Sequence, residues 1–170
     1  MQKKTFHRGV HPLHNIHEGK LPTRNLPIQD YASDSVTLVM NMNIGAPAVP
    51  CVKKGDQVKL GQVIAEASGF MSVPVHASVS GEVTAVEAIP YLGSAPVMAV
   101  SIKNDFLDTW TELHPLGSVE QVDPSLVIPA IRNAGITGMG GASFPTHVKL
   151  TFKPGASCDT IIVNGVECET

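Results

Sequence analysis

The chain has 170 residues and a mass of 18.0 kDa, which is enough for one ordinary domain or two small ones with a sizeable core. Its 12 Lys and Arg against 15 Asp and Glu give a formal net charge of −3, so it has no basic field for a phosphate backbone, and nucleic acid is excluded as the expected partner. A hydrophobic content of 43% with 16% charged residues excludes a disordered or coiled-coil chain.

Residues 1–35 predict an extended N-terminal segment, because much of it is rich in His, Pro and Asn and shows no sustained period of 2 or 3.6. His11, His14 and His17 fall at three-residue spacing there, which raises the alternative of a metal site. A neighbouring proline and glycine disfavour a helix that would bring the three imidazoles together. We therefore interpret them as surface histidines and predict no metal site.

Residues 36–103 predict an all-β domain of short strands joined by tight turns. Apolar residues alternate along the first strand, as expected when one face is buried: Val36, Leu38, Met40 and Met42. Further strands with β-branched residues beside glycine turns are expected over 52–58, 60–66 and 75–89, and 95–102 closes the set.

Two turns within this region, Gly55-Asp56 and Gly61-Gln62, precede a run over residues 75–83 that resembles the half-repeats of biotinyl/lipoyl-type barrel-sandwich domains. Carrier domains of that type present a modifiable lysine at the tip of the hairpin between the halves. Residues 67–73 occupy that position here and contain no lysine. A swinging-arm role is therefore not expected.

Residues 104–122 predict a linker, with the single tryptophan, Trp110, among polar and turn residues.

Residues 123–170 predict the beginning of an incomplete α/β domain. Its first helix is expected to start after an Asp123 cap and to stop at Gly135, although the interior Pro129 weakens this prediction. The apolar face of the helix is expected to comprise Leu126, Ala130, Ile131 and Ala134. The overall fold class is therefore mixed, with an N-terminal barrel-sandwich hybrid followed by the start of a nucleotide-binding domain.

A glycine-rich stretch follows this helix, with Gly135, Gly138, Gly140 and Gly141 within seven positions. Such a backbone can approach a ligand closely and turn its amides toward phosphate oxygens. Pro145 suits the first turn of a helix, and Lys149 would add a positive charge about one turn later. The stretch is neither a P-loop nor a dinucleotide fingerprint, and a plain glycine-rich turn with a surface lysine is the alternative.

Residues 159–164 form a short apolar run, as expected of a strand buried on both faces of a parallel sheet. Three polar residues lie at or beyond its carboxyl end: Asn164, Glu167 and Glu169. In open α/β sheets ligands bind at that edge, so an amide and two carboxylates there could hydrogen-bond a ring edge or a ribose. A solvated acidic loop is the alternative.

Six motifs then resemble, in order and over nearly the whole chain, the N-terminal half of the C subunit of the Rnf electron-transport complex. They are FHRGVHP at 6–12, NIGAP at 43–47, VKKGD at 52–56, PVHASVSG at 74–81, GMGGASFPTHVKL at 138–150 and NGVECE at 164–169. The glycine-loop domain of that family is similar to the flavin-binding subunit of respiratory complex I.

The resemblance implies a subunit that binds FMN and NADH and exchanges electrons between NAD(H) and iron–sulfur clusters or ferredoxin in an ion-translocating membrane complex. The cofactor-binding residues that it implies are Gly138, Gly140, Gly141, Phe144, Lys149, Asn164, Glu167 and Glu169. It implies no catalytic side chain, because the flavin carries the chemistry. Met139 stands where the complex I relative has arginine, and Ser143 stands where glycine is usual.

The family continues past the NGVECE motif to two 4Fe-4S clusters held by cysteine runs. The three scattered cysteines of this chain, Cys51, Cys158 and Cys168, cannot hold such a cluster. We therefore interpret Thr170 as the end of a fragment or of a truncated reading frame. The parent protein is expected to be a ferredoxin–NAD oxidoreductase subunit, and these residues alone are expected to be inactive.

The expected partners are other subunits of the membrane complex and a ferredoxin or flavodoxin-type carrier. No direct membrane insertion is expected, because the longest uncharged run, residues 35–52, is interrupted by asparagine, glycine and proline. The expected location is cytoplasmic, on the inner face of the cell membrane. Two alternatives remain: a non-catalytic barrel-sandwich docking module, and a soluble relative of the Rnf C subunit that serves another reductase.

Overall fold

The computed structural model describes residues 23–92, 95–139, 141–153, 155–160 and 162. The chain divides into two compact units, one of residues 1–31 and 158–170 and the other of residues 32–157. Within the described part of the first unit, the Leu26 amide donates to the Thr23 carbonyl at 3.0 Å and closes a turn. The three N-terminal histidines considered above lie outside the described residues. The helices and strands described below all belong to the second unit.

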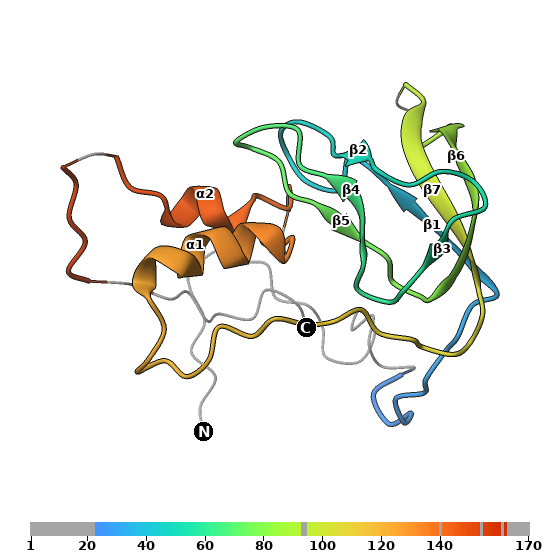
Figure 1. Cartoon of the computed structure of the whole chain (residues 1–170), viewed down its shortest axis with the longest axis horizontal. Coiled ribbons are helices and arrows are strands. Elements are labelled where there is room, and N and C mark those ends of the chain that lie inside the picture. The colour runs from blue at the N-terminus through green and yellow to red at the C-terminus, as the bar shows by residue number, and fades with distance from the viewer. Residues whose placement is uncertain (1–22, 93–94, 140, 154, 161, 163–170) are drawn as a thin grey trace, which may run out of the picture. The chain divides into compact units, whose positions relative to one another are not determined.

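The β region of the second unit consists of two antiparallel sheets (Figure 1). The larger has the order β1-β7-β6-β3, formed by Ser35–Val39, Val97–Asn104, Gly81–Ile89 and Gln57–Val58. The smaller has the order β2-β4-β5, formed by Val49–Pro50, Val63–Glu66 and Val75–His76. The pairing between β1 and β7 sets Val36 opposite Ile102 and Leu38 opposite Val100.

The core of the β region lies between these sheets and is built from small β-branched and aliphatic side chains. Its buried members are Met40, Ala48, Val58, Ile64, Ala65, Val75, Ala77, Val83, Val100 and Ile102. Members come from both sheets and from the turns between them, so the two sheets enclose one shared interior. Burial of this apolar surface is the main favourable term in forming the β region.

The predicted strands are confirmed in position but differ in length. The first ends at Val39, so Met42 is 52% exposed instead of sharing the buried face with Met40. The predicted strand over 52–58 is reduced to β3, because a tight turn forms at its start. In that turn the Asp56 carboxylate accepts from the Lys53 amide at 2.9 Å.

The two turns singled out in the sequence pair with the later half of the domain. The Gly55 amide donates to the Val83 carbonyl at 2.8 Å, and the Val83 amide donates to the Asp56 carbonyl at 2.9 Å. The Gly61 amide and the Gln62 carbonyl form the equivalent pair with Ala77, both at 2.8 Å. Each glycine turn is therefore closed by backbone hydrogen bonds to a distant segment, as expected of two related half-repeats.

The segment after β7 begins by lying against the β region. Trp110 forms a parallel bridge with Leu60, flanked by hydrogen bonds of the Leu60 amide and carbonyl to Thr109 and Thr111, each 2.9 Å. Nearer the start of this segment, the buried Ser80 hydroxyl donates a hydrogen bond to the Asp105 carboxylate at 2.6 Å. The first part of the predicted linker is therefore ordered by the β region.

Helix α1 spans Pro124–Asn133 and starts as predicted, with the Asp123 carboxylate accepting from the Ser125 amide at 2.9 Å. It ends in a Schellman motif, in which the Ile136 amide donates to Ile131 and the Gly135 amide to Arg132. Gly135 has φ +70°, and a Cβ there would lie 2.8 Å from the Pro74 carbonyl oxygen of the β region. Only glycine allows both this turn and this close approach.

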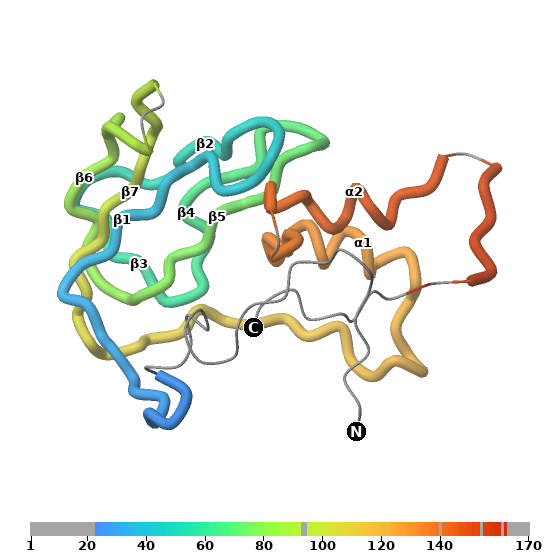
Figure 2. The backbone as a smooth tube through the Cα atoms, turned by 180° about the vertical axis from the view of Figure 1, so that it is seen from behind, coloured from blue at the N-terminus to red at the C-terminus, as the bar shows by residue number. Residues whose placement is uncertain are grey.

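The apolar face predicted for α1 is only partly covered. Ala130 and Ile131 are half-buried, whereas Leu126 is 50% exposed and Ala134 is also exposed. Helix α2, Thr146–Leu150, lies beside α1 in both views of the chain (Figures 1 and 2). No residue of α1 is fully buried.

The buried strand predicted over 159–164 is not seen in the described residues of that run. Asp159, Thr160 and Ile162 are outside any strand, and Ile162 is 90% exposed. A parallel strand needs a neighbouring strand for its backbone hydrogen bonds, and none pairs with it in the part of the chain that is described. Among the same residues, no helix is long and apolar enough to cross a membrane.

Candidate functional site

The glycine-rich stretch folds as a closed loop between α1 and α2. Its base is fixed by a bridge between Thr137 and Pro145 and by the Gly138 amide, which donates to the Phe144 carbonyl at 2.9 Å. The Thr146 amide adds a hydrogen bond to the Ile136 carbonyl at 3.1 Å. Residues 138–139 and 141–144 are thereby held at the base of one loop, which runs directly into α2.

Lys149 places its ammonium group against the start of this loop. A Cβ built on Gly138 would lie 2.7 Å from Lys149 Nζ and 3.7 Å from the Phe144 carbonyl oxygen. The same Nζ lies 5.8 Å from the centre of the Phe144 ring, within cation–π range. The structure therefore brings together three residues that the sequence singled out, and the missing side chain at Gly138 makes room for the charge.

The far end of the loop has a backbone conformation that favours glycine. Gly141 has φ +69°, and Ser143 has φ +51°, although serine carries a Cβ. The left-handed conformation at Ser143 costs an L-residue roughly 1–2 kcal/mol.

Helix α2 has five residues and starts after Pro145, which has no side-chain cap. The sequence predicts a helix N-terminus here as one part of an anion site. A helix this short aligns few peptide dipoles, so the fixed positive charge beside the loop comes from the exposed Lys149 side chain.

The β region contacts the loop and its helices through backbone groups. The Ile44 amide donates to the Ala142 carbonyl of the loop at 2.9 Å. Two successive carbonyls of the hairpin between β4 and β5 accept from the helices: Gly69 from Arg132 Nη2 at 3.0 Å, and Phe70 from His147 Nε2 at 2.7 Å. The loop is thus held from three points on the β region.

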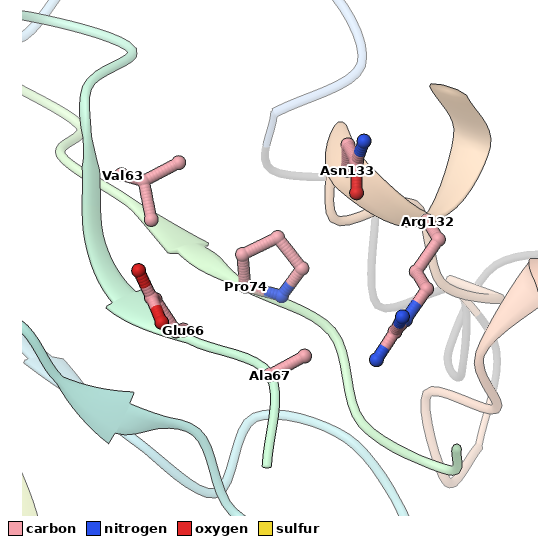
Figure 3. A pocket seen from close by; sticks show the side chains of 6 residues that line it. All are labelled: Val63, Glu66, Ala67, Pro74, Arg132 and Asn133. Carbon is pink, nitrogen blue, oxygen red and sulfur yellow. The ribbon is translucent and has the colours of Figure 1, made fainter. Parts of the chain in front are cut away.

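A small hollow of about 310 Å³ lies beside the Arg132 contact (Figure 3). Arg132 extends from α1 toward the two segments of the β region that carry Ala67 and Pro74, and Glu66 lies on the same segment as Ala67. Because Glu66 and Arg132 both line the hollow, it combines a carboxylate with a guanidinium and is a poor site for an anion.

His76 lies where the β region meets the C-cap of α1. A Cβ on Gly135 would lie 3.3 Å from its ring. Burial lowers the pKa of His76, and a hydrogen bond to the Asn133 backbone partly opposes that shift. A neutral imidazole against a glycine cap fits a packing role, and the ring contributes no charge to the loop.

The other predicted site residues, Gly140, Asn164, Glu167 and Glu169, lie outside the described residues. No cluster of three or more His, Cys, Asp or Glu side chains suited to a metal occurs among the residues that the structure covers. Within the same residues, Cys51 and Cys158 are exposed free thiols.

Sequence reasoning missed the residues that join the loop to the β region: Phe70, Arg132 and His147. The only available signals were a basic residue in the last turn of the predicted helix and a histidine inside the GMGGASFPTHVKL motif. Their partners are backbone carbonyls about 60 to 80 residues earlier, which no side-chain pattern marks.

Two family models match the chain. The model described as the RnfC barrel sandwich hybrid domain matches residues 4–107, and the model described as the Nuo51 FMN-binding domain matches residues 131–170. The first covers the β region and the second begins within α1, so the boundary between them falls in or near the linker and the first helix.

Named relatives are similar over almost the whole chain. The C subunit of the Na(+)-translocating ferredoxin:NAD(+) oxidoreductase complex of Acetobacterium woodii is 46% identical over 97% of this chain and 37% of its own length. Its counterpart in the proton-translocating ferredoxin:NAD(+) oxidoreductase complex of Clostridium ljungdahlii is 40% identical over 98% of this chain and 36% of its own length. The C subunit of the ion-translocating oxidoreductase complex of Pseudomonas aeruginosa is 44% identical over 85% of this chain and 19% of its own length.

Proposed function

The chain belongs to the RnfC family, the C subunits of Rnf complexes, and from this membership we propose that it is the part of an electron-transfer subunit that starts an FMN and NADH site. The chain spans about a third or less of the curated relatives named above, so the activity of the whole protein is part of this proposal. Electrons would pass between NAD(H) and iron–sulfur clusters or ferredoxin within an ion-translocating membrane complex. The chain would lie on the cytoplasmic face of that membrane.

The arrangement of Lys149 and Gly138 is the observation that carries the proposal. A loop that binds a phosphate needs a positive charge near backbone amides and no side chain in between. The space that a Cβ on Gly138 would occupy is partly taken by Lys149 Nζ, 2.7 Å from the Cβ position. The Lys149 ammonium group suits the phosphate or ribityl chain of FMN, and the amides of residues 141–143 would add donors, since the Gly138 amide donates to Phe144.

The protein's own residues would bind and orient the flavin. Lys149 would donate to the phosphate or ribityl oxygens, and the loop backbone from Gly138 to Gly141 would lie close to the same end of the molecule. Phe144 would cover one side of the lysine, because its ring already lies 5.8 Å from the ammonium group. When bound, FMN supplies the change between two-electron and one-electron transfer, and the protein supplies position and charge.

The nicotinamide side of the proposal has a different basis. Asn164, Glu167 and Glu169 are assigned to NADH and the flavin ring by family resemblance, and they lie beyond the described residues. Other subunits of the membrane complex and a ferredoxin or flavodoxin-type carrier are the proposed partners. The names of the relatives support this, since they describe ferredoxin:NAD(+) oxidoreductase complexes.

The proposal is tested by flavin titration of the protein at its natural length, followed by quenching of flavin fluorescence. Riboflavin, which lacks the phosphate, serves as the second ligand. We expect Lys149→Met to weaken FMN binding by about tenfold or more, because a charge-assisted hydrogen bond is worth about 1.5–3 kcal/mol. Lys149→Arg is the control that keeps the charge, and riboflavin affinity should change little in either variant if the lysine pairs with the phosphate.

Gly138→Ala gives a second test with little risk to the fold. The atom that the new methyl group meets is the end of a flexible lysine side chain, so the lysine moves away while the backbone keeps its place. FMN affinity should fall while hydrogen exchange in the β region stays unchanged. A protein at natural length that binds neither FMN nor NADH would overturn the proposal and favour the docking-module alternative.

A further inference from the structure

We propose that Arg132 and His147 are positioning residues through which the hairpin between β4 and β5 holds the glycine loop in its binding conformation. The proposal rests on the proposed flavin function and adds a role for the β region in it. The hairpin tip, defined here as residues 68–71, would act as a fixed support for the two helices that flank the loop. All of these residues belong to the same compact unit.

His147 makes the shorter of the two contacts. It lies in α2 two residues before Lys149, is 2% exposed, and has Nε2 at 2.7 Å from the Phe70 carbonyl oxygen. A carbonyl oxygen only accepts hydrogen bonds, so Nε2 carries the proton. The Phe70 ring also meets the imidazole edge to face, with centroids 5.8 Å apart and planes at 87°. One hairpin residue therefore fixes both the position and the rotation of the His147 ring.

Arg132 holds the other helix, α1, through a hydrogen bond to the neighbouring carbonyl, that of Gly69. Its Nη2 donates to the Gly69 oxygen at 3.0 Å, and its Nε is buried without a partner in the described residues. It lies in the last turn of α1, two residues before the Ala134 C-cap and three before Gly135. Figure 3 shows the side chain extending from α1 toward the β region. The two contacts hold the helices on both sides of the loop at consecutive carbonyls.

The hairpin is itself rigid enough to act as a support. The Ser68 amide donates to the buried Ser72 hydroxyl at 3.1 Å, and the Ser68 hydroxyl donates to the Pro47 carbonyl at 2.6 Å. The Ala46 amide donates to the Met71 carbonyl at 2.9 Å. The backbone that supplies the two acceptors is thus tied to the β2 side of the domain.

This arrangement also explains what replaces the absent lysine of a carrier barrel. The tip that would carry a mobile group there offers backbone carbonyls here, and both are used by residues of α1 and α2. A support needs fixed acceptors and no long flexible side chain, which is what Ser68, Gly69 and Phe70 provide. The β region would then contribute to the flavin site without touching the flavin.

The test substitutes His147 with residues that differ in where they place a donor. Gln puts its amide nitrogen near the Nε2 position, Asn puts it near the Nδ1 position, and Leu has no donor. In the protein at natural length we expect His147→Gln to keep FMN affinity within about threefold. His147→Asn and His147→Leu should weaken it about tenfold, because they leave the Phe70 carbonyl without its donor and release the hold of the hairpin on α2. If Gln keeps FMN affinity while Asn and Leu do not, the effect comes from the position of the hydrogen-bond donor and not from packing of the side chain.

Hydrogen exchange over residues 146–150 is measured on the same proteins without flavin. The Asn and Leu variants should lose protection there while the core strands β6 and β7 keep theirs. Equal affinity and equal protection in wild type, Leu and Gln variants would overturn the positioning role. If the wild-type protein binds no FMN, the proposed function fails, and the exchange data alone decide whether the hairpin holds α2.

Arg132 supplies a second pair of variants in case the His147 variants fold poorly. Arg132→Lys keeps a donor toward Gly69, whereas Arg132→Met keeps much of the length and removes the donor. We expect Met to lower FMN affinity several-fold more than Lys does. Equal affinities for the two would remove Arg132 from the proposal, even if His147 stays in it.

Discussion

The β region and the helical segment that follows it are stabilised in different ways. Between residues 35 and 104, two sheets share a core in which Ile64, Val83, Val100 and Ile102 are fully buried. Between residues 124 and 150, α1 has no fully buried residue, and in α2 only His147 is buried. The first region closes its own interior, whereas the second relies on contacts with the first.

Because of this difference, the β region and the helical segment are suited to different roles. A closed core gives a rigid body that can supply fixed acceptors, such as the carbonyls of Gly69 and Phe70. A loop that must admit a ligand has to leave its backbone accessible, so it cannot bury itself in the same way. The proposed flavin loop is therefore held from outside, and its stability should depend on the β region more than the reverse.

The largest effect should come from the core of the β region. Ile64→Ala removes a fully buried side chain from β4 and should lower the opening free energy of the barrel amides by about 3 kcal/mol. Native-state hydrogen exchange measures this. Val63→Ala, at a neighbouring position that is 37% exposed, is the matched control and should cost well under about 1 kcal/mol. Loss of protection confined to α1 and α2 would contradict the division described here.

The next effect should appear where the helical segment touches the β region. Gly135→Ala forces an L-residue into φ +70° and sets its Cβ 2.8 Å from the Pro74 carbonyl oxygen, so α1 and α2 should lose about 2 kcal/mol of local stability. Gly117→Ala is the control, because Gly117 has φ +93° with nothing within 4 Å of the Cβ position. Hydrogen exchange should show a smaller loss for that variant. A larger loss of hydrogen-exchange protection in α1 and α2 for Gly117→Ala than for Gly135→Ala would contradict the dependence of the helical segment on the β region.

A smaller effect of opposite sign should come from the loop itself. Ser143→Gly relieves the left-handed conformation at φ +51° and should stabilise the loop by up to about 1 kcal/mol, reduced by the greater chain entropy of glycine. Protection of the Gly138 and Thr146 amides, which close the loop base, reports the change. Ser143→Ala is the control and should bring no gain. An equal gain with alanine would assign the effect to the hydroxyl group.

The smallest effect concerns the cap of α1. A hydrogen bond from the Ser125 backbone amide lowers the pKa of Asp123, so the cap is fully present above the ordinary pKa of aspartate, near 3.9. It is lost as the pH falls through the lower value of the folded state. The Ser125 amide resonance should shift over that range, with fraying of the first turn. Asp123→Asn keeps an acceptor that does not titrate, and the same pH dependence in that variant would contradict the assignment.

Much of the β region could be read from local patterns. Alternation along residues 36–40 and the glycine turns at 55 and 61 predicted strands and turns that are present, and the Asp123 cap and Gly135 stop predicted the ends of α1. Each of these signals acts within a few residues, through side-chain periodicity, a cap hydrogen bond or a backbone conformation suited to glycine. Family resemblance added the prediction of a flavin loop, and the model described as the Nuo51 FMN-binding domain matches residues 131–170, which include that loop.

The predictions failed or stopped where a partner segment was needed. Met42 lost its buried position because the strand ended at Val39, and Ile162 is 90% exposed where a buried strand was predicted. The apolar face of α1 was misjudged for the same reason, since exposure of Leu126 depends on what packs over the helix. None of these outcomes is encoded in the residues themselves.

The amino-acid sequence by itself determined the strand and turn pattern, the ends of α1 and the presence of a glycine-rich loop before α2, because those depend on neighbouring residues. Only the tertiary structure decided that Lys149 lies against Gly138 and that His147 and Arg132 find the carbonyls of Phe70 and Gly69. Those contacts join residues 11 to 77 positions apart, and a backbone carbonyl has no identity that a sequence pattern could reveal.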